Sequence, residues 1–353
     1  MSARVPAVIL GGTGYVAGEL LRLVLGHPRL ELAAIASDSQ PGEPVARAFP
    51  HLAAACGDLA YVSIADATGV VARNARSAVL AAAPHGVSHK LIDGLLTRAE
   101  AAGAKPVVVD ISADYRFSDL AEYERVYRHP HGAPARAREF TCAVPEHLDR
   151  APTPHVAHPG CFVTASLLAV VPLLKLGLVD GPVFVSAVTG STGAGRTPVA
   201  GTHHPLRHSD LYAYGALAHR HGAEINALAR AAAGADDAVA FVPHSGPFAR
   251  GIHATVQAKL RKPLDTPAAL AALRDFYAGR PFVRVLPEPP RVKDVVASNY
   301  AHLSAATDGR TIAVMSVVDN LVKGAAGGAM QWMNRLLGFA ETDGLTTPAP
   351  GWT

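Results

Sequence analysis

The stretch Val5-Pro6-Ala7-Val8-Ile9-Leu10-Gly11-Gly12-Thr13-Gly14-Tyr15-Val16-Ala17-Gly18 decides the fold of this chain of 353 residues. An apolar run ends in a glycine-rich turn, and a helical pattern follows over Glu19 to Leu25. Backbone N–H groups and the helix dipole at such a turn can hold a pyrophosphate. A lone glycine motif also suits a plain tight turn, so its place after the first strand carries the prediction. The candidate cofactor contacts are Gly11, Thr13, Gly14, Tyr15 and Val16.

Apolar runs at Leu30 to Ala36, Ser77 to Ala83 and Pro106 to Ile111 continue the pattern of strand followed by loop. Strands that alternate with helices predict a parallel, doubly wound sheet, which is an α/β fold of Rossmann type. Around His129 to Pro159 the periodicity is lost, so we expect a domain boundary there.

Beyond that boundary, a helix is expected from about Phe162, and strand patterns then lie close together with few helices between them. Such spacing predicts a mixed or antiparallel sheet and therefore an α+β second domain. The strand patterns are Val183 to Val188, Ala238 to Val242, His253 to Leu260, Asn299 to Ala305 and Thr311 to Val318. The helical patterns are Ala223 to Ala233, Pro267 to Tyr277 and Gly324 to Leu337, and the last of these suits either domain.

Composition excludes several classes of protein. The net charge is +3, from 32 Lys and Arg against 29 Asp and Glu, without any block of like charge, which argues against a nucleic-acid partner. The most apolar stretch, Ala165 to Leu176, contains Pro172 and Lys175 and is shorter than a membrane span, so no membrane partner is expected. Three cysteines cannot form a disulfide framework, and the first residues do not resemble a signal peptide, so we expect a cytoplasmic protein.

The end of the second strand leaves the choice of dinucleotide open. Asp38 is a candidate for hydrogen bonds to the ribose hydroxyls of NAD. The flanking hydroxyls of Ser37 and Ser39 suit the 2′-phosphate of NADP instead. The residues at this strand end therefore fit either NAD or NADP.

Cys161, in His158-Pro159-Gly160-Cys161-Phe162-Val163, stands at the head of an apolar helix. Unpaired N–H groups and the positive end of the helix dipole favour a thiolate there, and such a sulfur is a nucleophile at neutral pH. The plain alternative is a small buried residue in a core helix. Cys56 and Cys142 lack this setting and are expected to be structural.

A thiolate nucleophile needs a proton carrier. The segment His219-Arg220-His221-Gly222-Ala223-Glu224 offers two imidazoles and a carboxylate just before a predicted helix. Candidate zinc ligands occur in His129-Pro130-His131 and His203-His204. However, no cysteine or carboxylate near them lies at the spacing of a structural metal site, so we expect no metal.

Two arginines are candidate anion contacts. Arg116 follows a strand of the first domain, at the sheet edge where ligands bind, and Arg196 lies in the glycine-rich segment Gly193-Ala194-Gly195-Arg196. An arginine can hold a phosphate or carboxylate by two parallel hydrogen bonds, although a surface ion pair is the plain alternative for each. A nicotinamide cofactor beside a thiolate and a histidine indicates hydride transfer to a thioester, formed from an acyl phosphate.

At this point the residues resemble a known family, the N-acetyl-γ-glutamyl-phosphate reductases of arginine biosynthesis. The likeness runs through nearly the whole chain, and its motifs occur in the same order. The matching segments are Gly11 to Leu21, Pro84-His85-Gly86, Asp110 to Arg116, Pro159 to Ala165, Gly193 to Arg196, His219 to Glu224, and Asp319-Asn320-Leu321-Val322-Lys323-Gly324.

The resemblance implies an NADP-binding Rossmann domain of residues 1–157 plus 320–353 and an inserted catalytic and oligomerisation domain of residues 158–319. It implies NADP(H) as cofactor, reduction of N-acetyl-γ-glutamyl phosphate to N-acetylglutamate 5-semialdehyde, and a homodimer or homotetramer. Cys161 would be the nucleophile and His219 the acid/base. The implied substrate-site residues are Arg116, Arg196, His221 and Glu224. The further implied cofactor contacts are Ser37, Ser39, Pro84, Gly193 and Asn320.

Two departures and two alternatives accompany this resemblance. The family commonly has Tyr and Pro after its cysteine, whereas this chain has Phe162 and Val163, which can alter a substrate contact. A related branch reduces an aminoadipyl or glutamyl phosphate carried on a small acidic protein, and Pro159-Gly160-Cys161 favours the free acetylated substrate instead. A non-catalytic dinucleotide sensor would keep the glycine turn but would not need Cys161 with its histidines.

Overall fold

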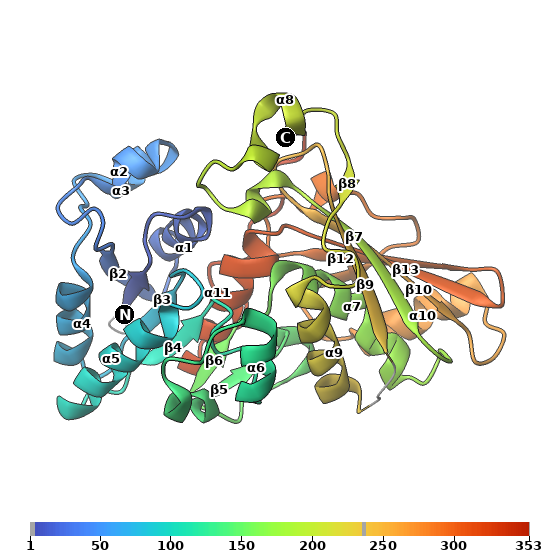
Figure 1. Cartoon of the computed structure of the whole chain (residues 1–353), viewed down its shortest axis with the longest axis horizontal. Coiled ribbons are helices and arrows are strands. Elements are labelled where there is room, and N and C mark those ends of the chain that lie inside the picture. The colour runs from blue at the N-terminus through green and yellow to red at the C-terminus, as the bar shows by residue number, and fades with distance from the viewer. Residues whose placement is uncertain (1–3, 235–237, 353) are drawn as a thin grey trace. The chain divides into compact units, whose positions relative to one another are not determined.

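A computed structural model describes residues 4–234 and 238–352. The chain divides into two compact units (Figure 1). Unit 1 comprises residues 1–142, 150–158 and 326–346, and unit 2 comprises residues 143–149, 159–325 and 347–353. The segments 143–149, 320–325 and 347–353 therefore group with unit 2, whereas the expected boundaries placed them in the first domain.

Unit 1 is built on a six-stranded parallel sheet with the order β2-β1-β3-β4-β6-β5. Its strands are β1 (Val5–Leu10), β2 (Leu30–Ala36), β3 (Ala78–Ala81), β4 (Val107–Asp110), β5 (Phe140–Cys142) and β6 (His155–Ala157). The central strands are buried, as expected for a sheet covered on both faces. The predicted doubly wound α/β fold is confirmed.

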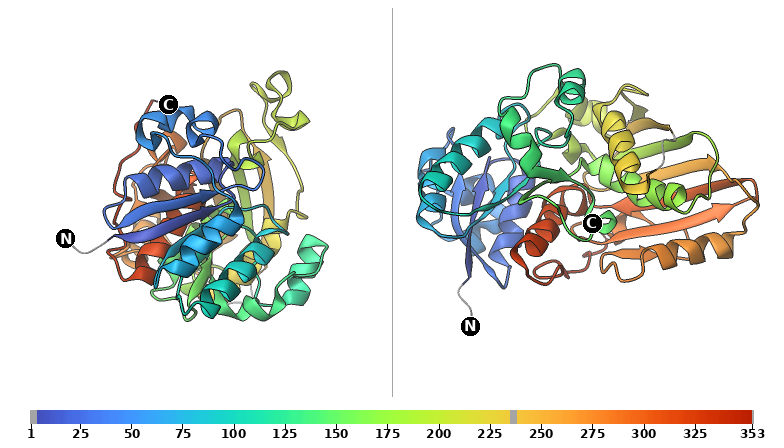
Figure 2. Two further views of the ribbon diagram at one scale, coloured as in Figure 1. Left: turned by 90° about the vertical axis from the view of Figure 1, so that its left-hand side faces the viewer. Right: turned by 90° about the horizontal axis from the view of Figure 1, so that it is seen from below.

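Helices follow the strands of unit 1 (Figure 2). They are α1 (Tyr15–Leu25), α2 (Val45–Ala48), α3 (Ala53–Cys56), α4 (Ile64–Arg73), α5 (Ser88–Ala101), α6 (Leu120–Tyr127) and α11 (Gly327–Leu337). One core cluster joins α4 and α5 to the strands through apolar residues such as Val71, Ile92 and Leu95. The C-terminal helix α11 packs on β3 and β4, so the last helical pattern belongs to unit 1.

Unit 2 is built on a seven-stranded mixed sheet with the order β11-β12-β13-β10-β7-β9-β8. Its strands are β7 (Val183–Thr189), β8 (Tyr212–Ala213), β9 (Val239–Ser245), β10 (Ile252–Lys259), β11 (Val283–Val285), β12 (Ala301–Thr307) and β13 (Thr311–Val318). β10 pairs antiparallel with both β7 and β13, whereas β7 pairs parallel with β9. The predicted α+β character is confirmed.

The helices of unit 2 are α7 (Cys161–Lys175), α8 (His204–Arg207), α9 (Arg220–Ala233) and α10 (Thr266–Phe276). α7 lies on β10, β13 and β7, and α9 packs on α7 and β9. Along β10, buried residues alternate with more exposed ones, so this strand has one face toward the core and one face away from it. Within residues 4–234 and 238–352, we find no helix whose length and apolar content would allow it to cross a membrane.

Candidate active site

The glycine turn of unit 1 is built by close backbone approach. Gly11 has φ +77°, and a Cβ there would lie 2.6 Å from the Cα of Ala83. Gly12 N–H donates to the Ala36 carbonyl (2.9 Å), and the Tyr61 hydroxyl donates to the Gly12 carbonyl (3.0 Å). Gly14 is the N-cap of α1, and no side chain caps this helix. The first-turn amides of α1 therefore stand where a phosphate can accept their hydrogen bonds.

The polar residues expected near the cofactor ribose lie at the end of β2. Asp38 Oδ1 accepts the Ile64 N–H (2.8 Å), so this carboxylate holds the start of α4. The hydroxyls of Ser37 and Ser39 lie 3.1 Å apart and form a polar pair at the same strand end. The carboxylate and the hydroxyl pair thus both lie at the strand end where the ribose of a dinucleotide is expected.

Hydrogen bonds join the segment that follows β3 to the segment that follows β4. Asp114 accepts N–H groups from Gly86 (2.8 Å) and His89 (3.0 Å), and His85 Nδ1 accepts from Ala113 (2.8 Å). These bonds shape the exposed turn that begins at Pro84.

Arg116 is nearly buried and uses two of its nitrogens on backbone carbonyls. Nε donates to His158 (3.0 Å) and Nη2 donates to Ile111 (2.8 Å). It thereby supports the chain just before Pro159. Its expected contact with an anion stays a prediction.

Cys161 is the first residue of α7 and is partly exposed. Gly160 is the N-cap, and the helix has no side-chain cap, which leaves first-turn amides near the sulfur. Gly160 N–H donates to Glu224 Oε1 (2.8 Å), and a Cβ on Gly160 would lie 2.5 Å from Nε2 of His221. A side chain at position 160 would therefore collide with this imidazole.

His219, His221 and Glu224 gather at the same helix end, as predicted. The rings of His219 and His221 lie 4.7 Å apart, and both pack on Phe162 at 6.0 Å. Glu224 is fully buried, and its carboxylate acts on the Gly160 backbone. The structure therefore brings the predicted nucleophile and its histidine cluster together within unit 2.

His219 is held as a neutral hydrogen-bond donor. Burial, followed by the charge of Arg220, lowers the pKa of His219 to about 4. Its Nδ1 accepts the His221 N–H (3.2 Å) and caps α9, so in the neutral ring the proton sits on Nε2. An Nε2–H group suits donation to an oxygen that gains negative charge.

Sequence reasoning missed Tyr214. Its ring lies 5.5 Å from that of His219, and burial followed by the negative charge of Cys161 raises the pKa of its hydroxyl. The phenol thus lies within electrostatic range of Cys161 and stays protonated. Nothing in the local sequence marks this tyrosine, because β8 and the chain after it bring it there. Phe162, a departure from the family pattern, forms an aromatic wall with His219 and Phe241.

Asn320 is fixed within unit 2 by two hydrogen bonds. Its Oδ1 accepts the Gly251 N–H (2.7 Å), and its Nδ2 donates to Thr192 Oγ1 (3.0 Å). A Cβ on Gly193 would lie 4.0 Å from that amide nitrogen, so Gly193 and Asn320 are neighbours. Arg196 follows on an exposed segment.

Next to Asn320, Asp319 is buried and accepts a two-point ion pair from Arg250, at 3.0 Å for each contact. This pair was not singled out from the sequence. It holds the backbone that leads to Asn320.

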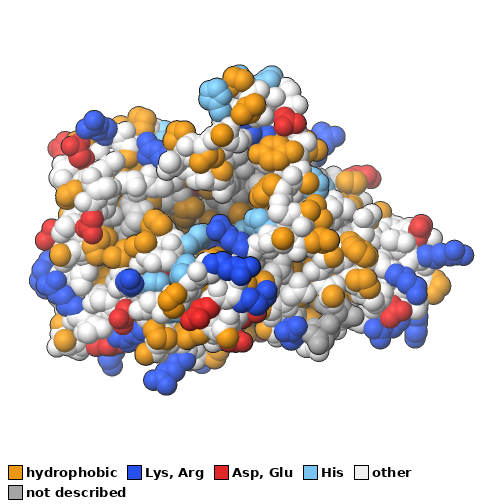
Figure 3. All heavy atoms as spheres, in the orientation of Figure 1, with side chains coloured by type: hydrophobic (Ala, Val, Ile, Leu, Met, Phe, Trp, Pro, Cys, Tyr) orange, Lys and Arg blue, Asp and Glu red, His pale blue; other side chains and the backbone are white. Residues whose placement is uncertain are grey.

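Within the described ranges, no group of three or more metal-ligating side chains is found. His203, His204 and His208 lie on the projecting segment around α8, where Figure 3 shows pale-blue histidines beside hydrophobic side chains. His129 and His131 instead pack with aromatic rings of unit 1, including Tyr123.

Two family models match the chain. Residues 6–156 match the NAD-binding domain of semialdehyde dehydrogenases, and residues 161–320 match the dimerisation domain of semialdehyde dehydrogenases. The chain is 40% identical over 349 residues to an N-acetyl-gamma-glutamyl-phosphate reductase of Ectopseudomonas mendocina, with 97% of this chain and 98% of that protein covered. It is 39% identical over 354 residues to the protein of the same name from Rhodospirillum rubrum, with 98% of each covered.

Solved structures support the fold. Aspartate semialdehyde dehydrogenase II of Vibrio cholerae, complexed with ASA, superposes with a TM-score of 0.69 at 15% identity, covering 95% of this chain and 98% of that one. A probable aspartate-semialdehyde dehydrogenase of Pseudomonas aeruginosa has a TM-score of 0.66 at 18% identity, with the same coverage. At this identity the likeness concerns the fold.

Proposed function

Because the chain belongs to the family of N-acetyl-gamma-glutamyl-phosphate reductases, we propose that it reduces N-acetyl-γ-glutamyl phosphate to N-acetylglutamate 5-semialdehyde and phosphate in arginine biosynthesis. It is an oxidoreductase with a nicotinamide dinucleotide cofactor. The observation that carries the proposed mechanism is the partly exposed Cys161 at the start of α7, whose neighbours Gly160 and Phe162 contact the rings of His221 and His219. A cytosolic site of action fits its three free cysteines.

In the first step, the Cys161 thiolate attacks the acyl carbon, and the carbon–oxygen bond to phosphate breaks. First-turn amides of α7 stabilise the thiolate before attack. The Nε2–H group of His219 donates to the acyl oxygen as negative charge develops there. The product of this step is a thioester on Cys161, and the released phosphate takes up a proton from the solvent.

For the second step, the glycine turn and the first amides of α1 would hold a nicotinamide dinucleotide, which would supply a hydride for the thioester carbon. His219 again donates a hydrogen bond to the oxygen, which carries negative charge until the carbon–sulfur bond breaks. The aldehyde then leaves and the thiolate is restored. Arg196, on its exposed segment, is the proposed contact for the phosphate, with His221 and Glu224 supporting the nucleophile from the Gly160 side.

Cys161→Ser tests this function. We expect loss of phosphate-dependent NADP reduction by the semialdehyde, because an alcohol at a helix start remains un-ionised at neutral pH. Cys142→Ser is the matched control and should keep its activity, since Cys142 ends a strand of unit 1. Turnover by Cys161→Ser at a rate near that of the parent would contradict the thioester step. Turnover with a carrier-linked acyl phosphate alone would contradict the free acetylated substrate.

We further propose NADP(H) as the preferred cofactor. The hydroxyl pair of Ser37 and Ser39 can donate to a 2′-phosphate, whereas Asp38 is engaged with the start of α4. Ser39 is exposed, so it is the more accessible of the two hydroxyls.

Ser39→Asp should raise the KM for NADPH, because a carboxylate repels the 2′-phosphate, and should leave the KM for NADH nearly unchanged. Steady-state rates with both cofactors give this comparison. An equal change in the two KM values would contradict a 2′-phosphate contact at Ser39.

Self-association through the outer face of the unit 2 sheet completes the proposal. Register places Met315, Thr255, Ser186 and Val242 side by side across β13, β10, β7 and β9 on the face away from α7. This row carries no charge, and the neighbouring row contains Phe184, which is 54% exposed. The matched family model describes a dimerisation domain, and an uncharged sheet face of this kind suits a second copy.

A further inference from the structure

Two fully buried charges lie in unit 2 and take no part in the chemistry above. Lys323 Nζ is 2.6 Å from Glu146 Oε1, and both side chains are 0% exposed. Lys323 Nζ also lies 5.6 Å from the centre of the Phe282 ring. Removing two charges from water costs free energy that their attraction often fails to recover, so such a pair is weak evidence for a purely stabilising role. A buried pair that fixes one particular conformation is the alternative.

Lys323 belongs to a short π turn, Val322–Ala326. The Gly324 N–H donates to the Asp319 carbonyl (2.9 Å), which is the wide hydrogen bond of this turn. Gly324 lies directly against the nucleophile: a Cβ there would be 2.8 Å from the Cβ of Cys161. The π turn therefore forms a wall of the Cys161 site. Turns of this type are rare and are frequent at functional sites.

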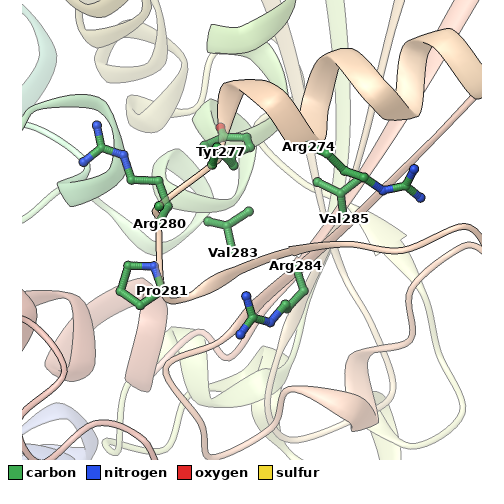
Figure 4. A pocket seen from close by; sticks show the side chains of 9 residues that line it. Arg274, Tyr277, Arg280, Pro281, Val283, Arg284 and Val285 are labelled. Carbon is green, nitrogen blue, oxygen red and sulfur yellow. The ribbon is translucent and has the colours of Figure 1, made fainter.

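Glu146 connects the same turn to the helix that begins at Cys161. The next residue, His147, is half-buried, and desolvation lowers its pKa to about 3, so its ring is neutral. His147 Nε2 lies 3.1 Å from the Tyr277 hydroxyl, which donates to the Leu168 carbonyl of α7 (2.6 Å). The Tyr277 hydroxyl therefore accepts from His147. Tyr277 is labelled in Figure 4, at the end of α10. The dipeptide Glu146-His147 thus ties α7 to the π turn.

We propose that Glu146 and Lys323 are positioning residues of the reaction, whose ion pair presses the π turn against Cys161 and so sets the sulfur relative to the first-turn amides of α7. Neither residue needs to touch substrate or cofactor for this role. The inference rests on the proposed function for its kinetic readout, whereas its thiol readout requires no substrate.

The test is the double variant Lys323→Met/Glu146→Met, which removes both charges and leaves no lone buried one. We expect it to fold, because an apolar pair of similar volume is often as stable as the buried ion pair. We expect kcat to fall by about 100-fold, the loss typical of a small misplacement of reacting groups. The KM for NADPH should stay unchanged. The rate of Cys161 alkylation by iodoacetamide, followed against pH by peptide mass spectrometry, should shift to higher pH.

The matched control is Arg280→Gln/Asp149→Asn. Asp149 lies three residues from Glu146, and its ion pair with Arg280 (2.7 Å) is exposed at the carboxylate. This control should leave both readouts unchanged. A double Met variant that folds and keeps the parental kcat and alkylation profile would overturn the proposal.

Gly324→Ala changes the contact between the π turn and Cys161 while it keeps the ion pair. This variant tests the proposal if the double Met variant does not fold. Its added methyl group would stand 2.8 Å from the Cβ of Cys161, so alkylation should shift in the same direction. An unchanged alkylation profile in Gly324→Ala would also overturn the proposal. A shifted thiol profile in a protein without acyl-phosphate reductase activity would contradict the proposed function alone.

Discussion

The side chain of His219 caps a helix and, in the proposed mechanism, also donates a hydrogen bond to the reacting oxygen. Its Nδ1 caps α9, and this bond leaves the proton on Nε2, where an oxygen can accept it. Burial keeps the ring neutral well below pH 6, because the pKa is lowered to about 4. The imidazole is therefore a fixed donor rather than a group that titrates near neutrality.

His219→Asn should lower kcat by about 100- to 1,000-fold, the usual contribution of one hydrogen-bond donor to an oxygen that gains negative charge. Asparagine can still accept the His221 N–H and cap α9, so the thermal midpoint and cofactor affinity should change little. Stopped-flow rates and cofactor titration measure these effects.

The lowered pKa of His219 predicts how activity depends on pH. His219 is neutral above about pH 4 and gains a proton only below that value, so the parental enzyme should show no loss near pH 6.5 from this group. An acid limb near pH 6.5 that disappears in His219→Asn would contradict a buried neutral ring.

At the scale of elements, the turn between β1 and α1 depends on a close approach of two backbones. Gly11 combines a left-handed φ of +77° with a position where a Cβ would meet backbone atoms of Ala83. Gly14, at the N-cap of the same helix, has an ordinary φ of −81° and open space around it. The two glycines therefore differ in what they require of the fold.

Gly11→Ala should lower the free energy of unfolding by about 1–3 kcal/mol, because the strained φ and the backbone clash act together. It should also weaken NADPH binding, since the turn and the first amides of α1 move. Gly14→Ala, the control, should unfold at nearly the parental denaturant concentration. Equal stability of the two variants would show that the turn at Gly11 tolerates a side chain.

At the scale of the whole molecule, the proposed cofactor site and the proposed catalytic residues belong to different units. Unit 1 contains the glycine turn and the hydroxyl pair, and unit 2 contains Cys161 and its histidine cluster. Helices cover one face of the unit 2 sheet. On the opposite face, the row of side chains that contains Thr255 carries no charge. This second face is the proposed surface for self-association.

Thr255→Glu should convert the proposed dimer to a monomer, because a symmetric contact would bring two buried carboxylates together. Light scattering after size-exclusion chromatography measures the mass. Ala121→Glu, on the exposed side of α6, is the control and should leave the mass unchanged. A Thr255→Glu protein with the parental mass would place the contact elsewhere.

Local signals were sufficient for much of the fold and for part of the site. The strand, glycine turn and helix at Val5 to Leu25 follow from residue types alone, and Cys161 begins α7 as its Pro-Gly flank predicts. The helix of His219 begins at Arg220, earlier than its apolar pattern, because a histidine caps it. The final helix begins at Gly327 rather than Gly324, since the π turn occupies the residues before it.

The sequence by itself determined that Cys161 begins an apolar helix, where a nucleophile is predicted, and that a glycine turn suited to a dinucleotide follows the first strand, because both features depend on neighbours in the chain. Only the tertiary structure decided that Tyr214 packs on His219, that Gly324 borders Cys161, that Asp38 is engaged by α4, and that Glu146 belongs to unit 2. These contacts join residues far apart in the chain. Their geometry comes from packing and buried hydrogen bonds, which local patterns of polarity do not predict.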